Sequence, residues 1–507
     1  MSDNLTSKTV RGIKWNSVAT VTNTVIQLGY SAVMARLLDP SAFGLMAMAG
    51  VVLGFSTYFS QMGMSQALIH QKELNKEDIR VAFTASFILG IAFFLITWLA
   101  APLSLYIFNN QELIPILRAT CVSLAINGIG STSASLMRRK LEFKSVAIIQ
   151  ITSYLIGYVF VGMTMAYLGF GVWSLVYASI CQAILSTVLS YMYAQHSLLL
   201  LFSWKYYKPL FAFGSKMSFI SFIDFLGSDL DTLLIGRFMG ETSLGLYNRA
   251  FIIIRQPVGL IVSTVSRVLF PAFSRIQSEI SRLKKVYLFS VSSVVLIVFP
   301  ICCGISIASE QIVHLMLGNQ WTAAIPILQV LAFTTPFRVL MHFSGIICDA
   351  TGTLKWKAIL HLLYFVVLAI LFFAFKSFGI MGFTYAVLLA AIIKNIGYYF
   401  IIRKILRLTI AELLKAYWAG IFSSIITSIF VYVTAVLLEN FHWPQLVVLL
   451  AMVIAGIIAW LLSLYLNPDK ALLAELYQKF GKDLISKKSN TTLGRFFIKA
   501  TKSLTNQ

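Results

Sequence analysis

Long apolar runs separated by short polar segments dominate this chain of 507 residues. The runs are roughly 20 residues long, the length of α-helix that crosses about 30 Å of hydrocarbon. They lack the strict alternation over about ten residues that marks a membrane β-strand. The pattern therefore predicts an all-α integral membrane protein with about 14 transmembrane helices. The predicted spans are 14–35, 43–66, 81–108, 114–136, 146–168 and 172–195, then 213–236, 244–268, 286–308, 322–348, 358–375 and 381–402, and finally 416–438 and 446–466.

The second half of the chain repeats the first. The segment ARLLDPSAFGLMAMA at 35–49 returns as GRFMGETSLGLYNRA at 236–250, an offset of 201 residues. Two later matches follow in the same order, at offsets of 211 and 208. A duplicated apolar chain is typical of a transporter whose substrate site lies between its repeats. We expect two parallel six-helix repeats plus two extra C-terminal helices. The predicted domains are an N-terminal six-helix bundle at 1–205, its repeat at 206–402, two additional spans at 403–466 and a basic cytoplasmic tail at 467–507.

Composition excludes a water-soluble fold. Hydrophobic residues make up 58% of the chain and charged residues only 12%, whereas a soluble domain carries about a quarter charged residues.

The basic residues define the predicted orientation. The N-terminus, the tail and every second loop together hold 32 Lys and Arg residues, whereas the opposite loops hold only Arg36, Arg237 and Lys376. By the positive-inside rule, both termini are predicted to be cytoplasmic. The net charge of +21 then reflects topology and attraction to anionic membrane lipids. Nucleic acid is not an expected partner, because the basic residues are dispersed over loops at the membrane edge.

Motifs for enzymatic chemistry are absent. The chain has no G-x-x-x-x-G-K-[ST] phosphate loop, no C-x-x-C and no H-E-x-x-H. We therefore predict no catalytic residues, no metal site and no bound cofactor. The six histidines are scattered over loops and two spans, and a proton relay through His342 and His361 stays open.

Polar residues form a stripe on the first predicted helix. Asn16, Thr20, Asn23 and Gln27 recur at helical spacing, so they share one face. Adding the repeat offset of 201 to the last three gives Ser221, Asp224 and Ser228. Lipid cannot satisfy such a face. The stripe predicts either a polar cavity wall or hydrogen bonding between packed helices.

Five basic residues lie away from the predicted membrane edges: Arg118, Arg249, Arg255, Arg338 and Lys394. A charge in this position costs about 2.5 to 3.5 kcal/mol on insertion scales and usually faces a cavity or a partner. Arg249, Arg255 and Arg338 have no basic counterpart in the first repeat, which favours a site that grips one anionic group asymmetrically. Arginine binds phosphate oxygens in a bidentate way. Pro257 and Pro336 stand beside two of them and predict bends or an opened backbone.

Aspartates offer an alternative partner for these arginines. By depth at about 1.5 Å per residue, Asp224 lies level with Arg255, and Asp229 or Asp231 level with Arg249. Two interpretations stay open: structural ion pairs, or an anion-binding or ion-coupled function.

Several segments support a family resemblance. The turn ARLLDP-SAFG at 35–44, the stretch RVLFPAF at 267–273, and LGNQW at 317–321 followed by IPIL at 325–328 resemble polysaccharide exporters of the Wzx type, especially the colanic-acid exporter branch. These exporters belong to the multidrug/oligosaccharidyl-lipid/polysaccharide superfamily, alongside the MATE drug exporters. The resemblance covers about residues 8–466.

The resemblance implies a function and a shape. It implies a V-shaped, two-bundle flippase in the bacterial inner membrane, which moves undecaprenyl-diphosphate-linked oligosaccharide to the periplasmic leaflet for exopolysaccharide or lipopolysaccharide biosynthesis. Alternating access is expected, and proton or sodium coupling stays open. A polysaccharide polymerase and glycosyltransferases are implied partners. The expected substrate-binding residues are Arg255, Arg338, Arg249, Arg118, Asn23, Gln27, Ser221 and Ser228, and the residues expected to couple ions or form ion pairs are Asp224, Asp229 and Asp231.

Two rival classes are weighed against the flippase. A MATE-like antiporter of organic cations needs a net acidic cavity, whereas the deeper sites here are balanced or basic. A membrane glycosyltransferase, polymerase or ligase needs a sizeable extramembrane catalytic loop. The longest outward loop, at about 309–321, has one carboxylate, Glu310, and no convincing acid/base pair.

Overall fold

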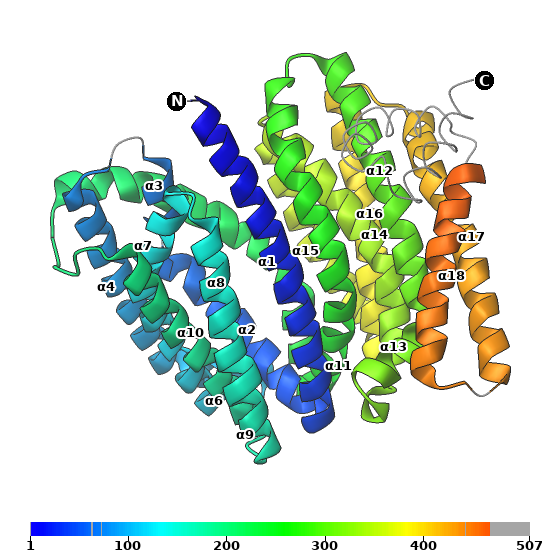
Figure 1. Ribbon diagram of the computed structural model, residues 1–507, viewed down its shortest axis with the longest axis horizontal. Helices are drawn as coiled ribbons and strands as arrows, with labels where there is room; N and C mark the ends of the chain where they lie inside the picture. Colours follow the sequence, from blue (N-terminus) through cyan, green and yellow to red (C-terminus); the bar gives the residue numbers. More distant parts are fainter. Residues whose placement is uncertain (1, 62–63, 72–73, 442, 467–507) are drawn as a thin grey trace. The chain divides into compact units, whose positions relative to one another are not determined.

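A computed structural model describes residues 2–61, 64–71, 74–441 and 443–466, and within them the chain is helical without any β-strand (Figure 1). The first part contains α1 (Ser2–Leu37), α2 (Pro40–Gln61), α3 (Met64–His70), α4 (Lys76–Ala100), η1 (Ala101–Leu103), α5 (Ser104–Phe108), α6 (Leu113–Thr120), α7 (Val122–Arg139), α8 (Phe143–Tyr154), the π-helix η2 (Leu155–Gly162), α9 (Met163–Tyr167) and α10 (Val172–Ala194). The rest contains α11 (Trp204–Arg275), α12 (Ile280–Ile307), α13 (Ser309–Met316), η3 (Asn319–Trp321), α14 (Ala324–Ala350), α15 (Leu354–Phe375), η4 (Lys376–Phe378), α16 (Gly379–Leu406), α17 (Ile410–Asn440) and α18 (Gln445–Leu466).

The predicted all-α membrane fold is confirmed. Among the described residues, 11 helical stretches are long and apolar enough to cross a membrane, and one of them, Leu354–Leu406, contains both α15 and α16. The number of 14 spans stays a prediction. The predicted basic tail at 467–507 lies outside the described residues.

The expected break between the spans 213–236 and 244–268 is present. The segment α11, from Trp204 to Arg275, consists of two helices that meet at a kink at Gly240, whose backbone angles are non-helical, with φ 77° and ψ −178°. A side chain would strain this conformation, so glycine allows the turn to shrink to one residue. In the first repeat the equivalent position is Asp39, which separates α1 from α2.

The helices continue through the two prolines where bends or an opened backbone were expected. Pro257 lies within α11 and Pro336 within α14, and neither helix ends there. A proline removes one backbone hydrogen bond, which neighbouring helices and side-chain hydroxyls in membrane proteins can offset.

The described chain divides into two compact units. Unit 1 comprises Met1–Ile253, Met316–Ala324 and Lys376–Phe383, and unit 2 comprises Ile254–Leu315, Ile325–Phe375 and Thr384–Gln507. The division falls inside α11 and not at the predicted repeat boundary of 205/206.

Within unit 1, the equivalent turns of the two repeats pack against each other through glycines. A Cβ atom on Gly44 would lie 1.7 Å from the carbonyl oxygen of Glu241, and one on Gly245 would lie 1.8 Å from the carbonyl oxygen of Pro40. Gly44 and Gly245 are 201 positions apart, and so are Pro40 and Glu241. The contact is therefore reciprocal, and any side chain at either glycine would prevent it.

The C-terminal end of α1 is capped by a distant segment of unit 1. The indole Nε1 of Trp321 donates to the carbonyl oxygen of Ala35 at 2.7 Å, and the amide of Gln320 donates to the carbonyls of Ala35 and Leu38. Trp321 is fully buried and its ring lies 5.5 Å from that of Phe43. These bonds satisfy carbonyl groups that a helix end leaves without partners.

Unit 2 includes the two helices that follow the repeat. Helix α12 packs along α17, and α17 packs along α18 (Figure 1). Trp460 on α18 donates from Nε1 to the carbonyl oxygen of Leu296 on α12 at 2.9 Å. At one end, Lys284 and Glu412 form an ion pair of 2.7 Å between α12 and α17. The buried apolar residues between these helices are Ala308, Val431, Ala435, Val448 and Met452.

Candidate functional site

Arg249 is held inside unit 1 by neutral groups. Its Nη1 donates to the hydroxyl of Ser31 at 3.1 Å, and its Nη2 donates to the amide oxygen of Asn248 at 3.2 Å. Its guanidinium carbon lies 4.2 Å from the centre of the Phe43 ring, a cation–π contact. The Nε atom is buried and has no hydrogen-bond partner.

Three tyrosines stand close to this guanidinium. Tyr30 makes edge contacts with Tyr154 and Tyr158, at ring distances of 5.9 and 5.2 Å, and the last two stack at 4.7 Å. All three hydroxyls are near enough to interact electrostatically with Arg249. The Tyr30 hydroxyl is buried without a hydrogen-bond partner. We call Arg249, Ser31, Phe43, Tyr30, Tyr154 and Tyr158 the Arg249 site.

The arrangement of the Arg249 site suits an anionic ligand. A cation within a membrane segment is costly unless it faces a partner, and no carboxylate contacts Arg249 in the described part of the chain. Guanidinium and phenol groups together can donate several hydrogen bonds to a phosphate or carboxylate. The unpartnered Nε and Tyr30 hydroxyl leave donors available for this purpose.

The polar stripe of α1 leads to the same place. Asn23 and Gln27 are half-buried on α1, and Ser31 follows one turn later on the same face. The hydroxyl of Ser31 contacts Arg249, so the stripe ends at the Arg249 site. Sequence reasoning missed Ser31 and Tyr30, although Ser31 continues the spacing of four residues. The side chain of Asn16 lies outside the described part.

The contacts of Arg249 described above do not include Asp231, one of the two aspartates expected at its depth. Asp231 is buried, and its carboxylate accepts from the hydroxyl of Tyr247 at 2.7 Å and from the backbone N–H of Thr232 at 2.9 Å. Asp229 is half-buried and has an interaction partner. Equal depth in the membrane did not imply the same side of the helix.

The remaining predicted residues occupy several elements. Arg118 on α6 lies over the ring of Trp98 at 4.6 Å. Arg255 is exposed on α11, and Arg338 is half-buried on α14, both in unit 2. Each has an interaction partner. The backbone of α11 includes Ser221, Asp224 and Ser228, but their side chains lie outside the described part, so the proposed pairing of Asp224 with Arg255 stays a prediction.

The two histidines considered as a relay have separate partners in unit 2. His342 contacts the hydroxyl of Ser266 through Nε2 at 2.9 Å, and His361 approaches the hydroxyl of Tyr398 at 3.4 Å. No group of three or more His, Cys, Asp or Glu side chains able to hold a metal ion occurs in the described ranges.

Comparison with known proteins identifies the family. Residues 33–326 match the family model described as "Polysaccharide biosynthesis protein". The chain is 26% identical to the lipopolysaccharide biosynthesis protein WzxC of Escherichia coli (strain K12), over 86% of this chain and 89% of that protein. It is 24% identical to the succinoglycan biosynthesis transport protein ExoT of Rhizobium meliloti (strain 1021), over 66% of this chain and 68% of that protein.

The fold also has a solved relative. The structure is similar to that of the lipid II flippase MurJ in an inward closed conformation, with a TM-score of 0.69, 15% identity, and coverage of 92% of this chain and 99% of that one. At this identity the likeness concerns the fold. The resemblance to polysaccharide exporters is confirmed, and the chain belongs to the polysaccharide biosynthesis protein family.

Proposed function

We propose that this protein is a flippase that moves undecaprenyl-diphosphate-linked oligosaccharide from the cytoplasmic to the periplasmic leaflet. The protein is a multi-pass membrane transporter and not an enzyme. Membership of the polysaccharide biosynthesis family, a relative named as a transport protein, and a fold shared with a lipid flippase support this function. We further propose alternating access, an inner-membrane location and cytoplasmic termini.

The Arg249 site is the observation that carries the substrate class. An oligosaccharyl diphosphate brings negative charge into the membrane, and a guanidinium held by neutral groups offers it a fixed positive charge. The amide groups of Asn23 and Gln27 lie on the same α1 face and suit sugar hydroxyls. The polyprenyl tail can stay in lipid. Arg255, Arg338 and Arg118 remain proposed further contacts of the diphosphate.

The Arg249 site argues against export of organic cations. A cationic substrate would be repelled by Arg249, which no described carboxylate neutralises. A polymerase and cytoplasmic glycosyltransferases are proposed partners, since such enzymes make and consume the lipid-linked cargo.

The test is the sidedness of lipid-linked oligosaccharide in cells depleted of this protein. A glycosidase added to spheroplasts reaches only the outer leaflet. We expect depletion to make the oligosaccharide accumulate in a protected form, and the wild-type chain to restore cleavage. Cleavage that is unchanged by depletion would contradict the proposed function.

A further inference from the structure

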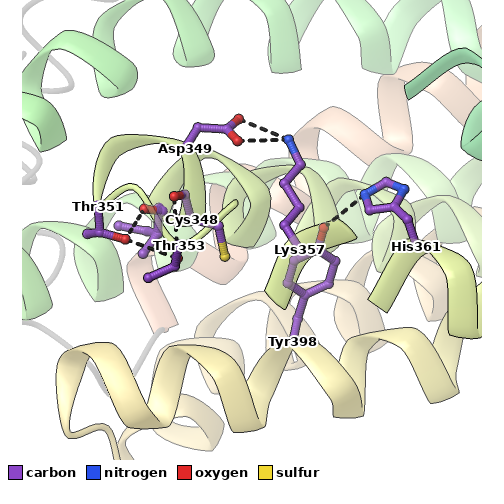
Figure 2. Close-up of polar contacts among 8 residues, drawn as sticks. Cys348, Asp349, Thr351, Thr353, Lys357, His361 and Tyr398 are labelled. Carbon is purple, nitrogen blue, oxygen red and sulfur yellow. Dashed lines mark hydrogen bonds and ion pairs between the residues drawn. The ribbon is translucent and has the colours of Figure 1, made fainter. Parts of the chain in front are cut away.

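In unit 2, ionisable side chains lie at successive turns of two neighbouring helices. Lys357 and His361 lie one turn apart on α15, and Lys394 and Tyr398 lie one turn apart on α16. Asp349, near the end of α14, completes the set, which we call the His361 cluster. Figure 2 shows Asp349, Lys357, His361 and Tyr398. The charge pattern assigns the α14–α15 connection to the cytoplasmic side. Ionisable groups at membrane depth are costly, and they usually mark a path for ions or substrate.

The end of the His361 cluster nearest the α14–α15 connection is an ion pair. The ammonium group of Lys357 lies 2.9 and 3.1 Å from the two carboxylate oxygens of Asp349. The side chain of Asp349 keeps 33% of its surface exposed, and that of Lys357 keeps 17%. Asp349 is thus the more exposed member of this pair.

The ring of His361 lies farther along α15 from the α14–α15 connection than Lys357, and only one of its two nitrogens has a hydrogen-bond partner. Its Nε2 is 3.4 Å from the hydroxyl of Tyr398, and its Nδ1 is buried with no hydrogen-bond partner. A neutral imidazole can accept a proton on one ring nitrogen. The enclosed Nδ1 therefore marks a group whose hydrogen bonding is incomplete in this conformation.

Cations flank this ring from both helices. Lys394 is buried, with its ammonium group 4.3 Å from the centre of the Tyr364 ring. Both Lys357 and Lys394 are near enough to interact electrostatically with His361. A second proton on the ring would place a third positive charge among them, and Coulomb repulsion in a low-dielectric interior is strong. A conformation that separates the ring from the two ammonium groups would lower this repulsion.

We propose that the His361 cluster is a proton-binding site that couples proton entry to cargo export. A proton binds a ring nitrogen of His361 in a conformation that separates the ring from the lysines. In the conformation described here the proton leaves the N–H bond and passes to cytoplasmic water near Asp349. This inference rests on the proposed function and identifies its driving ion.

Among the described residues, the neutral ionisable side chains beside the cluster are Cys348 on α14, Tyr364 on α15 and Tyr287 on α12, whose hydroxyl lies 3.1 Å from that of Ser344. Helix α14 also carries His342 and the cation Arg338, next to Phe337, whose carbonyl accepts from Asn395 on α16. Gly345 on α14 leaves room beside the cluster, because a Cβ there would lie 3.6 Å from the Tyr398 hydroxyl and 3.8 Å from Cε of Lys357.

The first test uses the native cargo in spheroplasts. Nigericin collapses the pH gradient, and valinomycin collapses the electrical potential. With one proton per cargo, one unit of pH gradient changes the outer-to-inner cargo ratio about tenfold. We expect nigericin to lower the outer-to-inner cargo ratio about tenfold per unit of pH gradient in the wild type and in the matched control His314→Gln. The ratio in His361→Gln should already be low and unaffected by nigericin.

The second test needs no cargo. Hydrogen–deuterium exchange of the full chain in lipid nanodiscs compares α15 at pH 5.5 and 7.5, after correction for intrinsic rates. We expect faster exchange at low pH in the wild type and His314→Gln but not in His361→Gln. If His361→Gln does not fold, Lys357→Met should shift the pH of this change upward, because one repelling cation is gone.

The two proposals fail in different ways. A nigericin response or pH-dependent exchange that persists unchanged in His361→Gln would overturn the proton site. So would an unchanged transition pH in Lys357→Met. Loss of any depletion effect on sidedness would contradict the flippase function alone, because the exchange measurement does not depend on cargo.

Discussion

In the described part of the chain no carboxylate contacts Arg249, so we expect its substitution to affect transport and stability differently. We expect Arg249→Met to lower cargo translocation about 10- to 100-fold, since a charge-assisted hydrogen bond contributes about 1.5–3 kcal/mol. The free energy of unfolding should stay the same or rise, because a buried cation with neutral partners carries a desolvation cost. The spheroplast assay and thermal unfolding in detergent measure the two effects.

Arg249→Lys is the matched variant. It keeps the positive charge but loses the planar fork that reaches Ser31 and Asn248 together. Translocation should fall to an intermediate level. A parallel loss of transport and thermal stability in Arg249→Met would instead make Arg249 a packing residue.

His196 gives unit 1 a predictable pH dependence. It follows α10, outside the membrane span, with Nδ1 3.1 Å from the carbonyl oxygen of Ser197 and Nε2 3.0 Å from the hydroxyl of Ser133. A carbonyl only accepts, so Nδ1 donates and Nε2 accepts, which satisfies the neutral ring. Burial of the imidazole lowers the pKa of His196 below its usual value.

The sign of the effect follows from proton binding. The folded state binds fewer protons at His196 than the unfolded state. The contribution of neutral His196 to the free energy of unfolding is therefore complete above about pH 6.5 and falls as the pH drops toward the pKa of the folded state. We expect the melting temperature of His196→Gln to change less between pH 7 and 5 than that of the wild type. His314→Gln should keep the wild-type slope, and equal slopes in all three would remove His196 as the cause.

At the residue level, the sequence identified cations within apolar segments but could not assign their contacts. The sequence marked Arg249 as a cation at membrane depth, but depth along a helix does not fix the direction around it. Asp231 therefore bonds Tyr247 and not Arg249. The contact between Ser31 and Arg249 joins residues 218 positions apart, which no local spacing can show.

At the scale of elements, the paired glycine turns predict substitutions of opposite sign within α2. Gly44→Ala should destabilise the protein by about 3 kcal/mol or more, because the new Cβ would collide with the backbone of Glu241 and overpacking costs about 1–3 kcal/mol even where side chains can shift. Gly50→Ala should stabilise it by up to about 1 kcal/mol through helix propensity, since nothing lies within 4 Å of that position.

Thermal unfolding of the two variants in detergent checks this prediction. Gly245→Ala should behave like Gly44→Ala, because its Cβ would meet the backbone of Pro40 at 1.8 Å. Similar stability of Gly44→Ala and Gly50→Ala would mean that the repeats do not pack through these glycines.

The same glycine turns show how far the helices could be predicted from the sequence. The duplicated motif revealed that Gly44 and Gly245 are equivalent, but repetition alone does not show that equivalent positions touch. The turn at Gly240 separates the two expected spans, and a single glycine with positive φ is enough to form this kink inside α11. Apolar length predicts that a helix exists, and backbone geometry decides where it breaks.

At the scale of the whole molecule, composition predicted the membrane class, and the repeat together with the resemblance of several short segments predicted the family. The units could not be read from the repeat, because the segments Met316–Ala324 and Lys376–Phe383 belong to unit 1 although they lie far along the chain. The Trp321–Ala35 bond illustrates the reason: a side chain in one repeat satisfies a helix end in the other.

Orientation in the membrane is the remaining whole-molecule prediction. Thirty-two basic residues on one side against three on the other should fix both termini in the cytoplasm. We expect a green fluorescent protein fused to the C-terminus of the full chain to fluoresce, because it folds in the cytoplasm. Alkaline phosphatase fused after Lys376 should be active, because that connection, at η4, is predicted to face the periplasm. A phosphatase fusion after Lys404, at the end of α16, is the matched control and should be inactive. The opposite pattern would mean that the protein has the reverse orientation in the membrane. The ion pair of Asp349 with Lys357 would then lie on the periplasmic side, so the cluster would take up protons at the end where we propose that it releases them.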